Sequence, residues 1–295
     1  MKLGMIHLDE FFCPVLIKDV KSNKFEYINI CNHIPNSPND ITGIISRWSE
    51  FGEAITALCG NRADATASLH QLAAPIERPG KIFAIGLNYA DHCEEANMPL
   101  PEKQIWFSKA SSAINAPYAP IELPAASDTL DYEAELVAVV GRTCRNVPAD
   151  RWKDVIFGYC VGNDVSVREW QMETSQWTLG KSFDRSAPIG PWITTKDEVD
   201  PHQLGLRSYV NDELRQNSNT KHLVFKLGEM VEKLSKAMTL EPGDLVFTGT
   251  TGGVGLAWQG KPHYLRPGDK SRVEIDGLGM IEGVVELGTD RMMIA

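Results

Sequence analysis

Residues 130–141, LDYEAELVAVVG, contain the pattern that decides the interpretation of this chain. In a β-strand, side chains alternate between the two faces, so Glu133 and Glu135 lie side by side on the face shared by Val137 and Val139. Two adjacent carboxylates repel each other unless a proton or a cation lies between them, and hard divalent cations prefer oxygen ligands. The alternative is an acidic edge strand in solvent, the usual situation of charged side chains.

A third carboxylate, Asp164, follows the apolar run VIFGYCVGN of residues 155–163. An aspartate after a strand is commonly a turn residue or a helix cap. Together with Glu133 and Glu135, however, it can complete a site of three carboxylates. Such a ligand set suits Mg²⁺ or Mn²⁺ better than zinc, which prefers histidine and cysteine.

The segment AIGLNYADHCEEANMP, residues 84–99, contains His92 and Glu95 at a spacing of three. In a helical turn the two side chains lie on one face and can form a hydrogen bond. A histidine oriented by a carboxylate is a general-base arrangement, because its pKa lies near neutrality. The alternatives are a surface pair without function and metal ligation by His92.

Two further segments can bind anionic groups. Lys181 stands between apolar residues in WTLGKSFD, where it is either a surface lysine with a buried stem or a group that binds a carboxylate or an oxyanion. VFTGTTGGVG, residues 246–255, is a strand that enters a glycine-rich loop. Such a loop is either an anion-binding backbone or a tight turn, and it lacks the patterns of nucleotide-binding loops.

The remaining patterns predict an α+β fold that is mostly β. Apolar runs at 81–87 and 244–250 indicate buried strands, and Asn211-Asp212 and Asp276-Gly277 indicate hairpin turns. Residues 227–240 predict a helix whose apolar face includes Met230, Val231, Leu234 and Met238. Strands and helices do not alternate regularly, which argues against a doubly wound parallel sheet.

The chain divides into two predicted parts. Residues 1–75 have short strand-like runs and a helical pattern from Ile44 to Leu58, so they indicate a small N-terminal α+β module. The segment PIERPGK marks the boundary, and residues 76–295 form the predicted catalytic domain.

Composition restricts the class of protein. The net charge is −10 and no Lys/Arg-rich run is present, so binding to nucleic acid or to an anionic membrane is not expected. The six cysteines include no Cys-x-x-Cys pair and are expected to be free thiols. The N-terminus lacks the apolar core of a signal peptide, and no run approaches the roughly 20 apolar residues of a membrane span. We therefore expect a cytoplasmic protein.

Taken in order, several segments resemble the fumarylacetoacetate hydrolase family, especially its longer members with an N-terminal module. The likeness runs from about Lys81 to Val285. It rests on GLNYADHCEE, DYEAELVAVVG, GYCVGNDVSVREWQ, LGKSFD, VNDELRQNSNT and the TGT–GVG loop.

The resemblance implies a mixed β-sandwich roll and a homodimer. It implies metal ligands for Mg²⁺ or Mn²⁺ at Glu133, Glu135 and Asp164. It also implies a water-activating dyad of His92 and Glu95, with Lys181 beside metal and substrate.

The same resemblance places Arg168, Gln171 and Thr250 at the substrate. The sequence departs from the family at Thr251, where many members have proline, and this change predicts a looser loop.

The implied activity is hydrolysis of a C–C bond in a small 2,4-dioxo acid, which gives pyruvate or a related 2-oxo acid and a carboxylic acid. A decarboxylase, hydratase or isomerase of 2-oxo dicarboxylic acids stays open, as does a metal-stabilised scaffold without activity. Four residues are candidates for the substrate-tail pocket, although such side chains are more often core: Trp106, Trp170, Met172 and Trp177.

Overall fold

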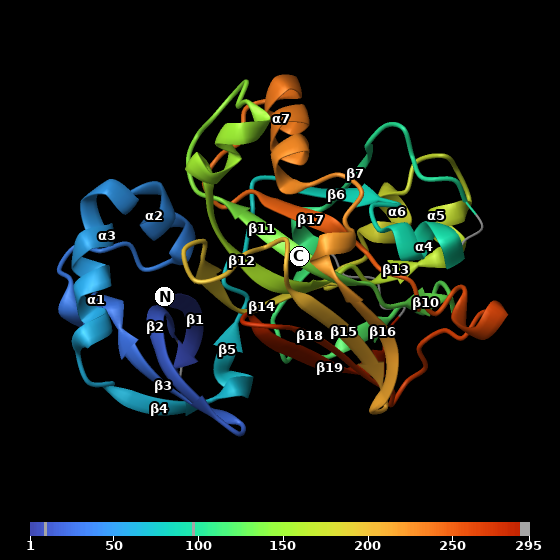
Figure 1. Ribbon diagram of the computed structural model, residues 1–295. Helices are drawn as coiled ribbons and strands as arrows, with labels where there is room; N and C mark the ends of the chain where they lie inside the picture. The colour runs from blue at the N-terminus through green and yellow to red at the C-terminus, as the bar shows by residue number, and fades with distance from the viewer. Residues whose placement is uncertain (9–10, 96–97, 290–295) are drawn as a thin grey trace.

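The structure is a computed structural model that describes residues 1–8, 11–95 and 98–289 (Figure 1). Its largest sheet is mixed, with the strand order β4-β3-β2-β1-β14-β12-β11-β17-β6-β7; β5 pairs with β1, and β8 with β14. The strands of this sheet are β1 Lys2–Leu8, β2 Phe11–Lys21, β3 Lys24–Asn29, β4 Ala65–Ser68, β5 Leu72–Ala73, β6 Ile82–Gly86, β7 Ile105–Lys109, β8 Ile114–Asn115, β11 Ala134–Val140, β12 Ile156–Asn163, β14 Ala187–Thr195 and β17 Leu245–Thr250.

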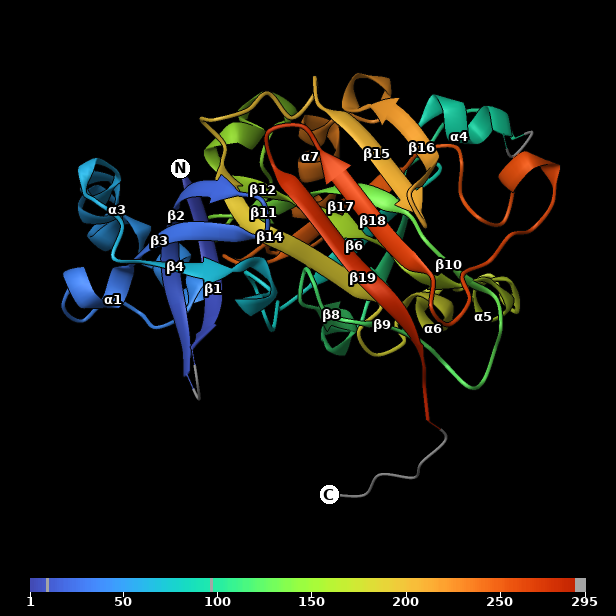
Figure 2. The ribbon, with the colours of Figure 1, turned by 90° about the horizontal axis from the view of Figure 1, so that it is seen from below.

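A second sheet crosses the half of the first sheet that residues 76–295 form, here called the catalytic half. Its strand order is β16-β15-β18-β19-β9 (Figure 2). Its strands are β9 Ile121–Leu123, β15 Gly205–Val210, β16 Glu213–Asn219, β18 Lys270–Ile275 and β19 Gly279–Leu287. A separate pair joins β10 Leu130–Asp131 to β13 Ser166–Val167. Side chains of both sheets meet in one core, in which Leu136 and Ala138 pack with Val273 and Ile281.

Short helices surround these sheets. The α-helices are α1 Ile30–His33, α2 Ile41–Ser46, α3 Trp48–Ala57, α4 Ala90–Glu95, α5 Arg168–Met172, α6 Thr178–Lys181 and α7 Leu227–Ala237. The 3₁₀ helices are η1 Leu58–Gly60, η2 Leu69–Gln71, η3 Ser111–Ala113, η4 Ala149–Asp154, η5 Thr220–His222 and η6 Trp258–Gly260. Helices α4, α5 and α6 gather at one end of the sheets, on the far side from the N-terminal module (Figure 1).

Strand β11 lies in the interior of the large sheet, between β12 and β17. All seven of its residues are buried, and its two faces belong to different cores. Leu136 and Ala138 face the second sheet, whereas Val137 and Val139 pack with residues of the N-terminal module. The predicted alternation is therefore confirmed for Ala134–Val140, whereas Glu133 lies one residue before this strand; the alternative of a solvent-exposed edge strand is excluded.

The N-terminal residues continue the large sheet. Strand β1 pairs antiparallel with β14 through Lys2 and Leu3, and the core beneath them joins Ile44 and Phe51 to the catalytic half. The predicted helical pattern from Ile44 to Leu58 forms α2 and α3, which are separated at Arg47, followed by η1.

Other sequence expectations can be compared directly. Both hairpins are confirmed, with positive φ at Asn211, Asp212 and Gly277 in the turns. Helix α7 is also confirmed, but it ends one residue before Met238, whose extended backbone (φ −150°) forms the C-cap. The predicted helix is therefore too long at its C-terminal end, although Met238 still packs, partly buried, against the same core as Met230, Val231 and Leu234. All six cysteines are free, and no helix in the described part of the chain is long and apolar enough to cross a membrane.

Candidate active site

Glu133, Glu135 and Asp164 form one buried group whose potential ligand oxygens all lie within 4.8 Å of one another. Strands β11 and β12 are antiparallel neighbours, so the start of one meets the end of the other; Glu135 is paired with Gly162. The backbone N–H of Asp164 also donates to the carbonyl oxygen of Glu133 at 2.9 Å. Antiparallel pairing therefore brings together carboxylates that are about thirty residues apart in sequence.

Buried cations surround this group. Lys181 Nζ donates to Glu133 Oε2 at 2.8 Å and to Asp164 Oδ2 at 2.7 Å. Lys109 Nζ donates to Asp164 Oδ1 at 2.6 Å, and Arg168 lies 2.7 Å from Glu133 Oε1. Lys181 is only 1% exposed, which excludes a surface lysine at this position.

Two of the buried charged residues were not recognised from the sequence. Lys109 ends the apolar strand β7, as Lys181 ends α6, and a lysine closing an apolar run was the available signal. Asp131 precedes Glu133 by two residues, so the carboxylate alternation in fact begins earlier. Asp131 accepts a hydrogen bond from Arg168 Nε at 2.8 Å.

The pKa values of Glu133 and Glu135 are shifted in opposite directions. Burial would raise the pKa of Glu133, but the charges of Lys181 and Arg168 outweigh it and keep that pKa below its usual value. Burial, together with the negative charges of Asp164 and Glu133, raises the pKa of Glu135 well above its usual value. Burial is the larger cause, and the negative charges of Asp164 and Glu133 add to it; a bound cation would oppose the effect of those charges.

The number of charged side chains in the cluster also indicates an excess of negative charge. Four carboxylates lie in this cluster, those of Asp131, Glu133, Glu135 and Asp164. The cationic side chains that contact them in the described chain are Lys109, Lys181 and Arg168. One negative charge is left over, so the donor set fits a divalent metal ion, and the oxygen ligands suit Mg²⁺ or Mn²⁺. His92 is not part of this ligand group.

The His92–Glu95 pair occupies α4. His92 Nδ1 lies 3.6 Å from Glu95 Oε2, which is beyond hydrogen-bond length, and Nδ1 is buried without a partner among the described residues. Both Glu95 oxygens lie 2.9 Å from the backbone nitrogen of Gly253, which donates to them. Catalytic hydrogen bonds are often this long in enzymes without bound substrate, so the distance does not exclude the pair.

The glycine-rich loop binds carboxylates, but they belong to the chain itself. The backbone N–H groups of Gly249, Gly253 and Gly255 donate to Glu135, Glu95 and Asp131, respectively. The loop thus holds the acidic residues of the site in place. Thr251 is fully buried, and its hydroxyl accepts a hydrogen bond from Gln216 Nε2; the looser loop expected from Thr251 stays a prediction.

The three predicted substrate-binding residues differ in what they can still bind. Arg168 NH1 donates to Gln171 Oε1 at 2.8 Å, whereas Arg168 NH2 is buried and has no partner within the described residues. The Thr250 hydroxyl donates to the carbonyl oxygen of Ala134 and accepts from Gln216, a buried residue that the sequence did not single out. The hydroxyl hydrogen of Thr250 is therefore already in use.

A cavity of about 560 Å³ brings these groups to one surface. Its wall includes every predicted site residue except Asp164, which lies fully buried. Met172 and Trp177 also line it. Trp106 instead lines a neighbouring groove, and Trp170 packs against Phe183.

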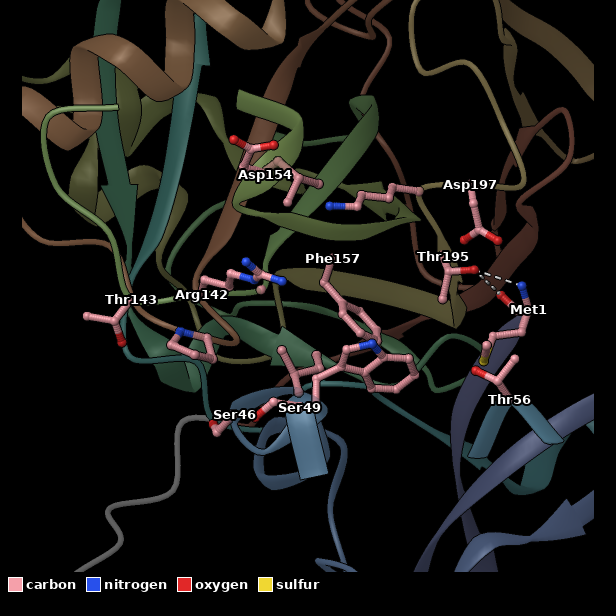
Figure 3. A pocket seen from close by; sticks show the side chains of 16 residues that line it. Met1, Ser46, Ser49, Thr56, Arg142, Thr143, Asp154, Phe157, Thr195 and Asp197 are labelled. Carbon is pink, nitrogen blue, oxygen red and sulfur yellow. Dashed lines mark hydrogen bonds between the residues drawn. The ribbon is translucent and has the colours of Figure 1, made fainter. Parts of the chain in front are cut away.

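A second cavity, of about 690 Å³, lies between the N-terminal module and the catalytic half (Figure 3). Trp48 and Phe157 meet in its wall at 4.8 Å between ring centroids. The N-terminal ammonium donates to Thr195 Oγ1 at 2.7 Å (Figure 3), and it also bonds to Glu198. This cavity is larger than the first but contains none of the predicted site residues, so we place the chemistry in the smaller one.

Comparison with known proteins now gives the family. The sequence model described as "Fumarylacetoacetate (FAA) hydrolase C-terminal" matches residues 81–286. The chain belongs to the fumarylacetoacetate hydrolase family. It is 46% identical over 244 residues to a Xenopus laevis protein named a mitochondrial oxaloacetate tautomerase, covering 80% of this chain and 76% of that one. It is 41% identical over 270 residues to a fumarylacetoacetate hydrolase domain-containing protein of Dictyostelium discoideum, covering 86% and 88% of the two chains.

Solved structures of the fumarylacetoacetate hydrolase family match almost the whole chain. The maleylpyruvate hydrolase of Sphingobium sp. SYK-6, in complex with manganese(II) and pyruvate, has a TM-score of 0.78 and 32% identity. The fumarylacetoacetate hydrolase of Exiguobacterium antarcticum has a TM-score of 0.83 and 31% identity. Each match covers 98% of this chain and 100% of the other.

These matches confirm the family and the α+β fold, and this fumarylacetoacetate hydrolase family member is an enzyme. Relatives are named as hydrolases, isomerases and tautomerases, so the family alone does not select the reaction. The cytoplasmic location stays a prediction, since one relative is named mitochondrial. The homodimer also stays a prediction.

Proposed function

We propose that this enzyme hydrolyses the C3–C4 bond of a small 2,4-dioxo acid and releases pyruvate or a related 2-oxo acid together with a carboxylic acid. The observation that carries the proposal is one cavity whose wall combines Glu133 and Glu135 of the three-carboxylate group with the His92–Glu95 pair and a buried lysine. A scaffold would need the carboxylates alone, so the combination favours catalysis.

Glu133, Glu135 and Asp164 are the residues that would hold Mg²⁺ or Mn²⁺. A divalent cation in this position supplies Lewis acidity to the carboxylate and the 2-oxo oxygen of the substrate. The cluster would then carry one net positive charge, which one substrate carboxylate neutralises. The charge balance thus supports a 2-oxo acid as substrate.

The chain's own residues provide the proton transfers. Glu95, fixed by Gly253, orients His92, and His92 takes a proton from a water molecule. The resulting hydroxide attacks the C4 carbonyl, and Lys181 with Gln171 donates hydrogen bonds to the oxyanion that forms. When the C3–C4 bond breaks, its electron pair stays on C3. The proton held by His92 then passes to C3, which completes the 2-oxo acid.

A second candidate is tautomerisation of a 2-oxo dicarboxylic acid. It is favoured by the 46% identity to a protein named oxaloacetate tautomerase. The same pair could move a proton between C3 and the 2-oxo oxygen without any attack by water. A decarboxylase would need the cation site but less of the water-activating pair.

The test is a panel of 2,4-dioxo acids and oxaloacetate, assayed with Mn²⁺ or Mg²⁺ and again with EDTA. We expect metal-dependent release of a 2-oxo acid from the 2,4-dioxo acids. His92→Asn should abolish this release, since asparagine cannot take up the proton. If no 2,4-dioxo acid is cleaved while oxaloacetate is tautomerised or decarboxylated, the hydrolase proposal is wrong and the second candidate replaces it.

A further inference from the structure

We propose that the substrate of this enzyme has an apolar tail, and that the Phe107–Trp177 pair limits the length of that tail. The proposal rests on the proposed function of the site, because it concerns the part of the substrate beyond C4. It names a substrate class different from the dicarboxylic acid in the printed name of a relative.

The cavity has two chemically different parts. One part contains the ionisable groups already described. The other is lined by Leu87, Phe107, Trp177 and Leu256, together with Met98 and Met172. A substrate held by its carboxylate at the first part must direct its other end along the second.

Three large apolar side chains of this second part are open to water. Met172 is 68% exposed, Met98 48% and Leu256 36%. Apolar side chains that gather at a cavity mouth and remain exposed are typical of a binding surface. An alkyl or aryl tail would cover them and remove their apolar surface from water, which favours binding.

A substrate tail that ends in a carboxylate would find few cationic side chains to pair with in this part of the cavity. Lys181 and Arg168 contact Glu133, and Arg168 also contacts Asp131, so both cations belong to the reacting end, where Arg168 NH2 keeps the donor that has no partner among the described residues. Apart from the groups of the reacting end, the one charged side chain among the described residues lining this cavity is Lys261, at its open side. A buried carboxylate without a paired cation is costly.

Phe107 and Trp177 form the end wall of the apolar part of the cavity. Their rings meet edge to face, with centroids 5.4 Å apart. Both side chains also line a neighbouring groove of about 450 Å³, which Trp106, Leu234 and Met238 complete. The pair therefore separates two spaces that a smaller side chain would connect.

Gly86 fixes the Trp177 ring in this position. A Cβ atom built on Gly86 would lie 2.5 Å from the indole ring, so the ring rests directly on the backbone of β6. Packing against backbone leaves the indole little room to rotate, which makes it a firm end wall.

The experiment measures kcat/KM for a series of acylpyruvates whose tails lengthen from methyl to octyl, each paired with an analogue that has a terminal carboxylate. We expect kcat/KM to rise with tail length and then to fall, and to be about tenfold lower or worse for each carboxylated analogue. In Trp177→Ala, the fall should move to longer tails, so that the ratio of kcat/KM for the longest tail to kcat/KM for the methyl substrate rises.

Leu179→Ala is the matched control, because Leu179 is 64% exposed on α6, the helix that Trp177 immediately precedes, and does not line the cavity. Phe107→Leu provides a second opening of the same wall if Trp177→Ala does not fold, as judged by circular dichroism. A length profile that is unchanged in both folded wall variants, or carboxylated tails that are preferred, would overturn the proposal.

Calorimetric binding of uncleavable 2-oxo acids with the same tails, in the presence of Mn²⁺, is measured in parallel. It separates this proposal from the proposed function. Binding that follows tail length without any cleavage would reject the hydrolase and keep the apolar tail. Cleavage with no dependence on the tail would keep the hydrolase and reject the tail.

Discussion

At the residue scale, Lys181 both neutralises buried carboxylates and lines the candidate active-site cavity. Its ammonium group is the counter-ion of both Glu133 and Asp164, and it also lies on the wall of the cavity. Burial would lower the pKa of Lys181, but the charges of Asp164 and Glu133 raise it above its usual value, so the side chain stays charged. A permanently charged donor can stabilise an oxyanion, but it does not act as a base.

We therefore predict that Lys181→Ala lowers kcat by about 10²–10³, the usual effect of losing one oxyanion donor. In the absence of metal, the Lys181→Ala substitution should also lower the free energy of unfolding by about 3–5 kcal/mol, because the buried carboxylates of Glu133 and Asp164 lose a counter-ion. Steady-state kinetics and urea unfolding, each with and without Mn²⁺, measure the two effects. Lys103→Ala is the control, since Lys103 is exposed. An unchanged kcat in Lys181→Ala would rule out the donor role.

At the element scale, the glycine-rich loop after β17 holds Glu95 of the proposed general-base pair in position. Gly253 has φ +99°, and a Cβ atom there would lie 2.0 Å from the carbonyl oxygen of Arg215. Its N–H also donates to both oxygens of Glu95. Glycine is needed at this position because any side chain would push the loop away and leave Glu95 without its donor.

We predict that Gly253→Ala lowers kcat about tenfold or more, because the general-base pair loses its orientation. The matched control is Gly252→Ala: Gly252 has no positive φ, and its Cβ would meet nothing nearer than 3.4 Å. Kinetics and thermal unfolding of both variants make the comparison. Equal activity in the two variants would show that the Gly253–Glu95 contact does not matter.

At the scale of the whole molecule, the two sequence modules share one interior. We propose residues 1–75 and 76–295 as modules of sequence, but they are not separate in packing. The core that holds Leu3, Ile44 and Phe51 also holds Val137 and Phe247 of the catalytic half. Removing the first module would expose the edge of β14 and this apolar surface.

A single cooperative unfolding transition is therefore the expected outcome for the full chain. Differential scanning calorimetry should give equal calorimetric and van't Hoff enthalpies. Two transitions, one of them assigned to residues 1–75 by limited proteolysis, would show instead that the module folds by itself.

Metal binding should also stabilise the whole molecule, because it favours the folded state alone. At a Mn²⁺ concentration of 100 times Kd, we predict a gain of about 2.7 kcal/mol in unfolding free energy. EDTA should reverse the gain, and Glu135→Gln should reduce it, since one carboxylate ligand is lost. Thermal unfolding across a Mn²⁺ titration measures this effect. A full gain in Glu135→Gln would remove that residue from the proposed ligands.

The sequence by itself determined the strands, the hairpin turns and the family. Each of these follows from local patterns: alternation in 130–141, turn residues such as Asn211-Asp212, and ordered segments that resemble one family. The predicted helix extended past Ala237 because helical periodicity does not specify where the chain leaves the helix. Local motifs indicated the carboxylates, the His92–Glu95 pair and Lys181, whereas the resemblance to the family supplied Arg168, Gln171 and Thr250.

Only the tertiary structure decided what surrounds those residues. Lys109 and Asp131 complete the charge balance, and Gln216 engages the Thr250 hydroxyl, through contacts between distant parts of the chain. The glycine-rich loop is typical of a site for an external anion, yet its N–H groups bind the chain's own carboxylates. The physical reason is that burial and ion pairing depend on which strands become neighbours, and a local pattern does not specify those neighbours.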